Sequence, residues 1–64
     1  MCESKAVVIK NGSEEVLLDD VVLLNVREDG SIVLINIEGR ELVVKELKLD
    51  RIDFIKHRIY FKPR

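Results

Sequence analysis

Residues 31–39 read SIVLINIEG, and this stretch decides the class of fold that the sequence predicts. Successive side chains of an extended strand point to opposite faces of a sheet. The apolar side chains here form two sets, one on each face: Val33, Ile35 and Ile37, and Ile32 and Leu34. Because an open antiparallel sheet commonly leaves one face to water, a strand that is apolar on both faces predicts either a small closed barrel or a sheet face that a second subunit covers.

Turn signals on both sides of this stretch divide the chain into short strands. The Asn-Gly pair at 11–12 and the Asp-Gly pair at 29–30 are hairpin signals, because these residues adopt positive φ readily. Residues 38–40 turn the chain again, and the Asp-Asp pair at 19–20 predicts a bend or bulge within a long apolar segment. The expected strands are 6–9, 15–28, 31–39, 41–49, 51–55 and 58–62, with a tight turn at 56–57.

The number and spacing of these strands predict the fold class. Five to six short antiparallel strands with tight turns predict an all-β protein, a small antiparallel barrel similar in plan to SH3-like or OB-like folds. Segment 41–49 is expected to be one unbroken strand, with Val43 and Leu47 on one face and Val44 on the other. Since a chain of this length buries only about 60% of its unfolded surface, residues 1–64 are expected to form a single domain.

The overall charge argues against nucleic acid as a partner. The chain has 11 Lys and Arg against 12 Asp and Glu, and only 5% of its residues are aromatic. It therefore lacks both the basic surface that binds a phosphate backbone and the rings that stack on bases. An RNA-binding small barrel remains an alternative, and the residues it would use are Arg51, Lys56, Arg58 and Lys62.

Other function classes lack their sequence signals. There is no Gly-rich phosphate loop, no Ser/His/Asp set and no CxxC pair, so the chain is not expected to be an enzyme. His57 is interpreted as a solvated turn residue. The acidic residues expected to form turns and caps are Asp19, Asp20, Asp50 and Asp53. No apolar run reaches the roughly 18 residues that cross a bilayer, and a single cysteine is typical of a reducing compartment, so a cytoplasmic protein is expected.

Cys2 is the residue with the most distinctive chemistry, because it follows the initiator methionine directly. Aminopeptidase removes Met1 when the next side chain is small, and the new terminus then carries an α-amine beside a thiol. The two groups close a chelate ring on a metal, and a bound cation displaces both protons near neutral pH. Nitrogen and thiolate donors suit Ni(II) or Cu(II), whereas tetrahedral Zn(II) sites use more Cys or His ligands than this chain has.

One chain supplies only part of a coordination sphere through Cys2. A symmetric dimer would bring two amines and two thiolates to one ion. Alternatively, the backbone amide of Glu3 would complete the plane within one subunit. A third interpretation gives Cys2 no role beyond that of a terminal residue before the first strand.

The sequence as a whole resembles the CooT family, small nickel-binding accessory proteins of carbon monoxide dehydrogenase maturation. The similarity covers essentially the entire chain. It rests on MCESKAVVI at the start, the Asn-Gly turn followed by EEVLLDDVVLLNV, the single glycine of IEGRELVVKELKLDRIDFI, and the closing HRIYF.

The resemblance implies a homodimer of small β-barrels that binds nickel through Cys2 and delivers it without acting as a catalyst. The client implied by the family is carbon monoxide dehydrogenase. The alternatives are an RNA-binding barrel and a protein-interaction module without metal, in which the apolar strand at 31–39 forms a subunit interface.

Overall fold

The computed structural model describes residues 3–64, which form six β-strands, and this part of the chain contains no helix. The strands are β1 (Ser4–Lys10), β2 (Ser13–Val26), β3 (Ile32–Asn36), β4 (Glu41–Val44), β5 (Leu47–Asp53) and β6 (Arg58–Pro63). The all-β prediction is confirmed. Within residues 3–64 there is accordingly no helix of the length and apolar character that a membrane span requires.

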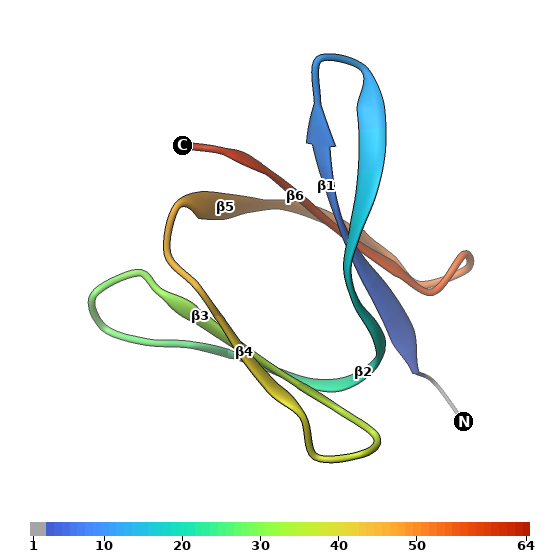
Figure 1. The fold of residues 1–64 in the computed structure, drawn as a ribbon, viewed down its shortest axis with the longest axis vertical. Helices are drawn as coiled ribbons and strands as arrows, with labels where there is room; N and C mark the ends of the chain where they lie inside the picture. Colours follow the sequence, from blue (N-terminus) through green and yellow to red (C-terminus); the bar gives the residue numbers. More distant parts are fainter. Residues whose placement is uncertain (1–2) are drawn as a thin grey trace.

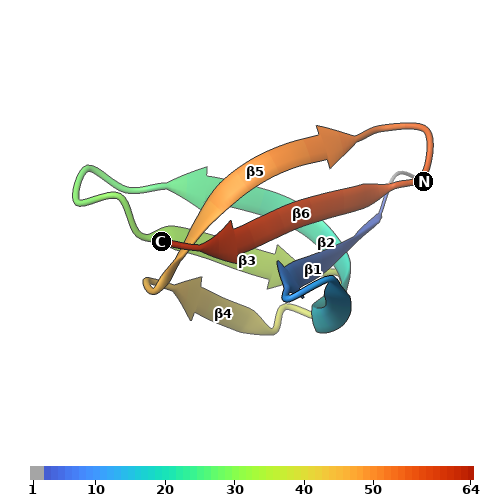
Figure 2. The ribbon, with the colours of Figure 1, turned by 90° about the horizontal axis from the view of Figure 1, so that it is seen from above.

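The six strands form one strongly curled sheet in the order β4-β3-β2-β1-β6-β5 (Figures 1 and 2). Four of the neighbouring pairs are antiparallel, and β1 and β6 run parallel. β4 and β5 are the two edges, so the molecule is a half-barrel. The small-barrel prediction is confirmed with one refinement: the parallel pair joins the two ends of the chain, which no local turn signal can reveal.

β2 serves both halves of the sheet, because it bends at the predicted position. Its first half pairs with β1 and its second half with β3. Two residues lie between Leu18 and Val21 on β2, whereas only one lies between their partners Ala6 and Ser4 on β1, so the pairing contains a bulge at 19–20. Asp20 has a φ of 55° there, and its carbonyl accepts a hydrogen bond from the backbone of Ile37.

The predicted hairpin turns are present. Asn11 and Gly12 have φ values of 51° and 80°, which is the geometry of the tight turn that best matches strand twist. At the next hairpin the carboxylate of Asp29 accepts hydrogen bonds from the backbone N–H and the hydroxyl of Ser31, at 2.9 and 2.7 Å.

β3 is shorter than predicted. The buried side chain of Asn36 accepts hydrogen bonds from the backbone N–H groups of Glu38 and Arg40, at 3.1 and 2.8 Å, and so ends the strand in a turn. Ile37 therefore lies in this turn and is 55% exposed. Its predicted place on the strand face with Val33 was wrong.

The prediction of one unbroken strand over 41–49 was also wrong. The chain turns at Lys45 and Glu46, whose carbonyls accept hydrogen bonds from the side chain and the backbone of Arg64, at 3.1 and 3.3 Å. This corner changes the alternation, so that Val44 and Leu47 both pack on the core instead of lying on opposite faces.

The expected strand 51–55 is the end of β5 instead. β5 ends at Asp53, because the carboxylate of Asp53 accepts hydrogen bonds from the backbone of Ile55 and Lys56, at 3.0 and 2.9 Å. The turn before β6 consequently spans 54–57 rather than two residues. β6 itself lies where a last strand was predicted.

The core fills the concave side of the half-barrel. It combines side chains from five strands: Ala6, Val8, Leu18, Val21, Ile32, Leu34, Val44, Ile59 and Phe61. β3 supplies Ile32 and Leu34 to this face, and Val33 on the opposite face is also buried. Both faces of most of β3 are thus covered within one chain, although the sheet curls into a half-barrel and does not close.

Alanine substitutions at Leu34 and Ile37 test this placement. Leu34 is fully buried, so Leu34→Ala should lower the free energy of unfolding by about 2–5 kcal/mol. Ile37→Ala should lower it by less than about 1 kcal/mol, because the side chain is largely exposed. Urea denaturation followed by circular dichroism measures both values. Equal losses would show that Ile37 is buried in a longer strand, on the face that it was predicted to share with Val33.

Candidate functional site

The predicted metal ligand, Cys2, lies outside the described residues, as does Met1. The description starts at Glu3, and β1 starts one residue later, at Ser4. The elements around the start of β1 therefore define the described surroundings of the predicted site.

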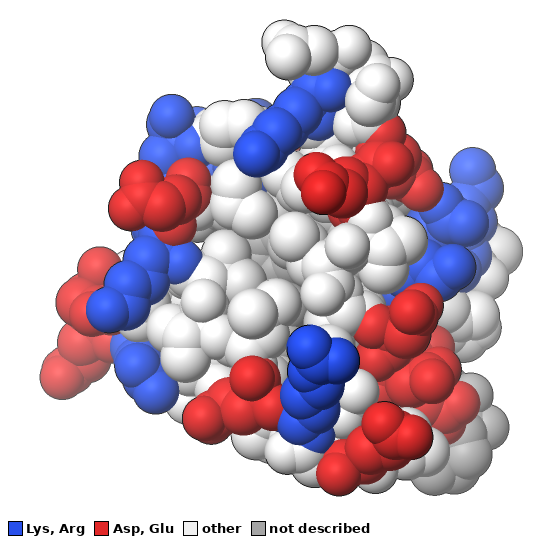
Figure 3. Space-filling view, viewed as in Figure 1, with Lys and Arg blue, Asp and Glu red and all other residues white. Residues whose placement is uncertain are grey.

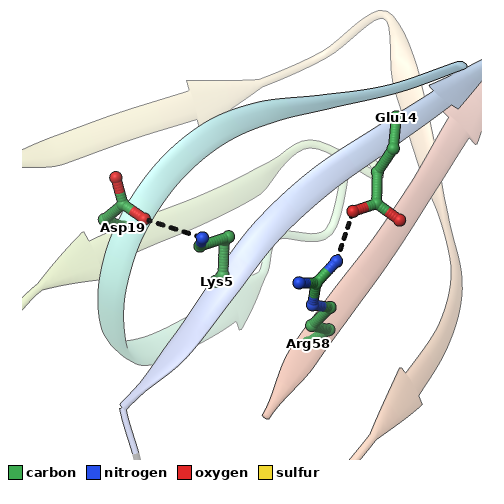
Figure 4. Close-up of polar contacts among 4 residues, drawn as sticks. All are labelled: Lys5, Glu14, Asp19 and Arg58. Carbon is green, nitrogen blue, oxygen red and sulfur yellow. Dashed lines mark hydrogen bonds and ion pairs between the residues drawn. The ribbon is translucent and has the colours of Figure 1, made fainter. Parts of the chain in front are cut away.

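The start of β1 is held on both sides. The backbone N–H of Lys5 donates to the carbonyl of His57 at 2.9 Å. The ammonium of Lys5 pairs with Asp19 at 3.8 Å, and Arg58 of β6 pairs with Glu14 of β2 (Figure 4). Such partly exposed pairs contribute only about 0.2–1 kcal/mol each. The main constraint is the backbone pairing of β1 with both β2 and β6.

Glu3 has a carboxylate oxygen, Oε2, that is buried without a hydrogen-bond partner among the described residues. A carboxylate oxygen that leaves water without a donor or a cation raises the free energy of the folded state. Glu3 adjoins Cys2 in the sequence, so this oxygen belongs to the same end of the chain as the predicted ligand. The sequence pattern contains no signal for this side chain, since only its burial distinguishes it from the other glutamates.

His57 lies in the exposed turn between β5 and β6, as predicted, and has a φ of 56°. Its backbone carbonyl, rather than its ring, makes the contact with Lys5 described above. The structure thus brings His57 to the start of β1 through the main chain.

The four aspartates singled out in the sequence have structural contacts. Asp20 lies at the bulge and Asp19 pairs with Lys5. Asp53 caps the β5–β6 turn, and these backbone hydrogen bonds, that of Lys56 above all, hold the pKa of its carboxyl below the usual value. In the described range 3–64, no three residues of the types His, Cys, Asp and Glu gather closely enough to hold a metal ion.

The basic residues of the RNA-binding alternative are largely engaged with carboxylates. Asp50 pairs with Arg51 at 2.7 Å and with Lys62 at 3.1 Å, and Arg58 pairs with Glu14. The guanidinium of Arg51 also stacks on the ring of Tyr60, 4.0 Å from its centroid. Figure 3 shows charges of both signs around an uncharged centre on one face of the molecule. This arrangement does not favour a phosphate backbone as the partner.

The comparisons with known proteins point to one family. The family described as "CO dehydrogenase accessory protein CooT" matches residues 1–62. Among solved structures, the chain is similar to the crystal structure of a CooT candidate from Carboxydothermus hydrogenoformans, with 30% sequence identity over 98% of each chain and a TM-score of 0.86. No protein with a curated description matches the chain.

The ion pairs of Asp50 make a testable contribution to acid stability. Hydrogen bonds from Lys62 first, and then from Arg51, lower the pKa of its carboxyl below the ordinary value of 3.8. A lowered pKa in the folded state stabilises the fold above the unfolded pKa, and this stabilisation is lost as the pH falls through the folded value. Asp50→Asn should therefore reduce the loss of stability between about pH 5 and pH 2.

Denaturant midpoints measured across this pH range test the Asp50 contribution. Glu28→Gln is the matched control, since Glu28 is an exposed turn residue, and its profile should run parallel to that of the wild type. An Asp50→Asn profile as steep as the wild-type one would contradict the assignment.

Proposed function

This chain belongs to the CooT family of CO dehydrogenase accessory proteins, and from that premise we propose that it binds Ni(II) through the thiolate of Cys2 and carries the ion during CO dehydrogenase maturation. The observation that carries the proposal is the family match over residues 1–62, a range that includes Cys2. Removal of Met1 would add the α-amine of Cys2 as a second donor.

The donor set fits nickel as cargo. An amine and a thiolate are donors that a planar divalent ion such as Ni(II) accepts, and the ion displaces their protons when it binds. Two donors from one chain leave coordination positions open. We propose that a second copy of the chain fills them in a homodimer, so that one ion is shared by the two copies.

Two features of the described chain support a nickel site at Cys2. β1, the strand that follows Cys2, is hydrogen-bonded on both sides, so a ligand at its start is attached to a rigid element. Glu3, the residue that follows Cys2, has a carboxylate oxygen that is buried without a hydrogen-bond partner among residues 3–64. A carboxylate close to the ligands would stabilise a bound cation.

The role is that of a carrier and not of a catalyst. CO dehydrogenase is the proposed acceptor of the ion, and the cytoplasm is the proposed compartment, because a free terminal thiolate persists in a reducing environment.

Replacement of Cys2 tests the proposal. Processed wild-type protein should bind Ni(II), and Cys2→Ser should weaken binding by more than the roughly 10- to 100-fold that loss of an outer-shell partner costs. Calorimetric titration measures the affinity, and the thiolate-to-nickel absorption band identifies the ligand. Intact-mass spectrometry confirms that Met1 is absent in both samples. Equal binding by the two proteins would remove Cys2 from the site.

The delivery step has a separate test. Nickel-loaded wild-type protein should restore CO oxidation by nickel-free CO dehydrogenase, whereas Cys2→Ser at the same nickel concentration should give the rate of free nickel alone. Ser13→Ala, in the hairpin at the opposite end of β1, is the control that should behave as wild type. No difference between wild type and free nickel would contradict a carrier role.

Glu3→Gln tests the contribution of the buried carboxylate. The substitution keeps the size of the side chain and removes its charge, so nickel affinity should fall by about 10-fold if the carboxylate acts as an outer-shell partner. Glu15→Gln, at an exposed position of β2, is the matched control. Unchanged affinity in Glu3→Gln would limit Glu3 to a structural role.

A further inference from the structure

Of the three asparagines in the chain, only Asn11 is followed by glycine. Asn11 and Gly12 form the two-residue turn between β1 and β2, with φ values of 51° and 80°, and both residues are exposed. The turn lies at the end of a hairpin that projects from the rest of the molecule, at the top of Figure 1. We refer to residues 10–13 as the hairpin tip.

The hairpin tip is held by fewer contacts than the rest of β1. β6 pairs with residues 5–8 of β1, whereas Ile9 and Lys10 are paired only with β2. Residues 10–16 are all exposed, so the tip buries little apolar surface. Two-stranded hairpins alone are only marginally stable in water, and segments with few buried contacts open locally at a low cost in free energy. The backbone of Asn11 can therefore leave its turn conformation while the core stays folded.

Gly12 leaves its own backbone nitrogen accessible. The position where a side chain would begin at Gly12 has no atom of a non-adjacent residue within 4 Å. The hydrogen bond that closes a four-residue turn joins its first and last residues, which are Lys10 and Ser13 here. The turn therefore does not use the N–H of Gly12, and this nitrogen can approach the side-chain carbonyl carbon of Asn11.

The other two asparagines lack this combination. The Asn36 side chain is buried and accepts two backbone hydrogen bonds, and the N–H of the following residue, Ile37, donates to the carbonyl of Asp20 at 2.9 Å. Asn25 lies within β2, paired with β3, and the next residue is Val26, which is branched at Cβ and crowds its backbone nitrogen. The fold and the following residue thus oppose an attack on either of these amides.

We propose that Asn11 is a site of spontaneous deamidation in the folded protein. The backbone nitrogen of Gly12 loses its proton and bonds to the side-chain carbonyl carbon of Asn11. The bond from this carbon to the amide nitrogen breaks, and that nitrogen takes up a proton and leaves as ammonia. A five-membered cyclic imide remains, which one water molecule opens at either of its two carbonyls. The net change is the exchange of an amide and water for a carboxyl group and ammonia, without an oxidant or an enzyme.

The two products differ in their effect on the hairpin. Opening at one carbonyl gives aspartate, which also suits a two-residue turn with positive φ. Opening at the other gives isoaspartate, in which the main chain runs through the former side chain and gains one backbone atom. Because turn type and loop length fix the register of a hairpin, isoaspartate should disturb the pairing of Lys10 with Ser13. Either product adds one negative charge to a chain with a formal net charge of −1 at pH 7.

The test compares the folded chain with the same chain unfolded in urea. Both are incubated at neutral pH, and mass spectrometry of proteolytic peptides locates the gain of about 1 Da that conversion of an amide to a carboxyl group causes. Asn11 in the folded chain should react within about 10-fold of its rate in the unfolded chain, because opening of the hairpin tip breaks few hydrogen bonds. Asn25 and Asn36 should keep their amides in the folded chain. A rise of one pH unit should speed the reaction about 10-fold, since the deprotonated nitrogen is the nucleophile.

Matched variants identify the reacting group. Asn11→Gln keeps the amide but requires a larger ring for the same attack, so the gain in mass should be lost. Asn25→Gln makes the same change at another exposed asparagine, and it should react as the wild type does. An isoaspartyl methyltransferase should label incubated wild-type protein and leave incubated Asn11→Gln unlabelled. Ion exchange separates the products, and the isoaspartyl form should unfold at a lower urea concentration than Asn11→Asp.

Three outcomes would overturn the assignment. A folded chain that protects Asn11 by more than about 10-fold relative to the unfolded chain would show that the turn locks the residue. A folded chain that loses the amide of Asn25 or Asn36 as fast as that of Asn11 would show that the hairpin tip has no special reactivity. An Asn11→Gln protein that gains mass at the wild-type rate would place the reaction elsewhere.

Discussion

The two-residue link between β4 and β5 is the constraint on which the rest of the structure depends. β4 and β5 are the opposite edges of a six-stranded sheet, and only Lys45 and Glu46 connect them. In a flat sheet these edges would lie about 24 Å apart, whereas such a link spans about 11 Å at most. The sheet must therefore curl until its edges approach each other at this corner. Arg64 holds the corner through the carbonyls of Lys45 and Glu46, and it also donates to the carbonyl of Gly30, at 3.0 Å.

The curl has consequences for both the core and the terminus. It encloses a core that a chain of 64 residues could not otherwise protect, and the bulge at 19–20 lets β2 follow the curve without losing its partners. It also brings β6 to the free side of β1 (Figure 2). The first strand of the chain thus becomes a central strand, and the segment that carries the proposed ligand starts from one of the best-paired parts of the sheet.

The sequence predicted the features that local chemistry determines. The turns at 11–12 and 29–30 and the bend at 19–20 depend on residues that adopt positive φ or disfavour strands, and all three are present. The errors occurred where distant groups act. The alternation over 41–49 gave no sign of a corner that Arg64 stabilises from the other end of the chain, and the parallel pairing of β1 with β6 has no local signal. The prediction for Cys2 came from the chemistry of a terminal aminothiol and from family resemblance, whereas the buried oxygen of Glu3 became visible only in the fold.

A half-barrel differs from a closed barrel in a way that matters for a carrier. A closed barrel has no free strand edges, but the half-barrel leaves β4 and β5 as edges and exposes the side chains of Phe54 and Ile55 to solvent. Under the proposed sharing of donors, the retention of the ion depends on the association of two copies, because each copy alone offers only an amine and a thiolate. Separation of the copies halves the number of donors at once. Under that proposal, the ion can be released when the copies separate, without the unfolding of a metal cage.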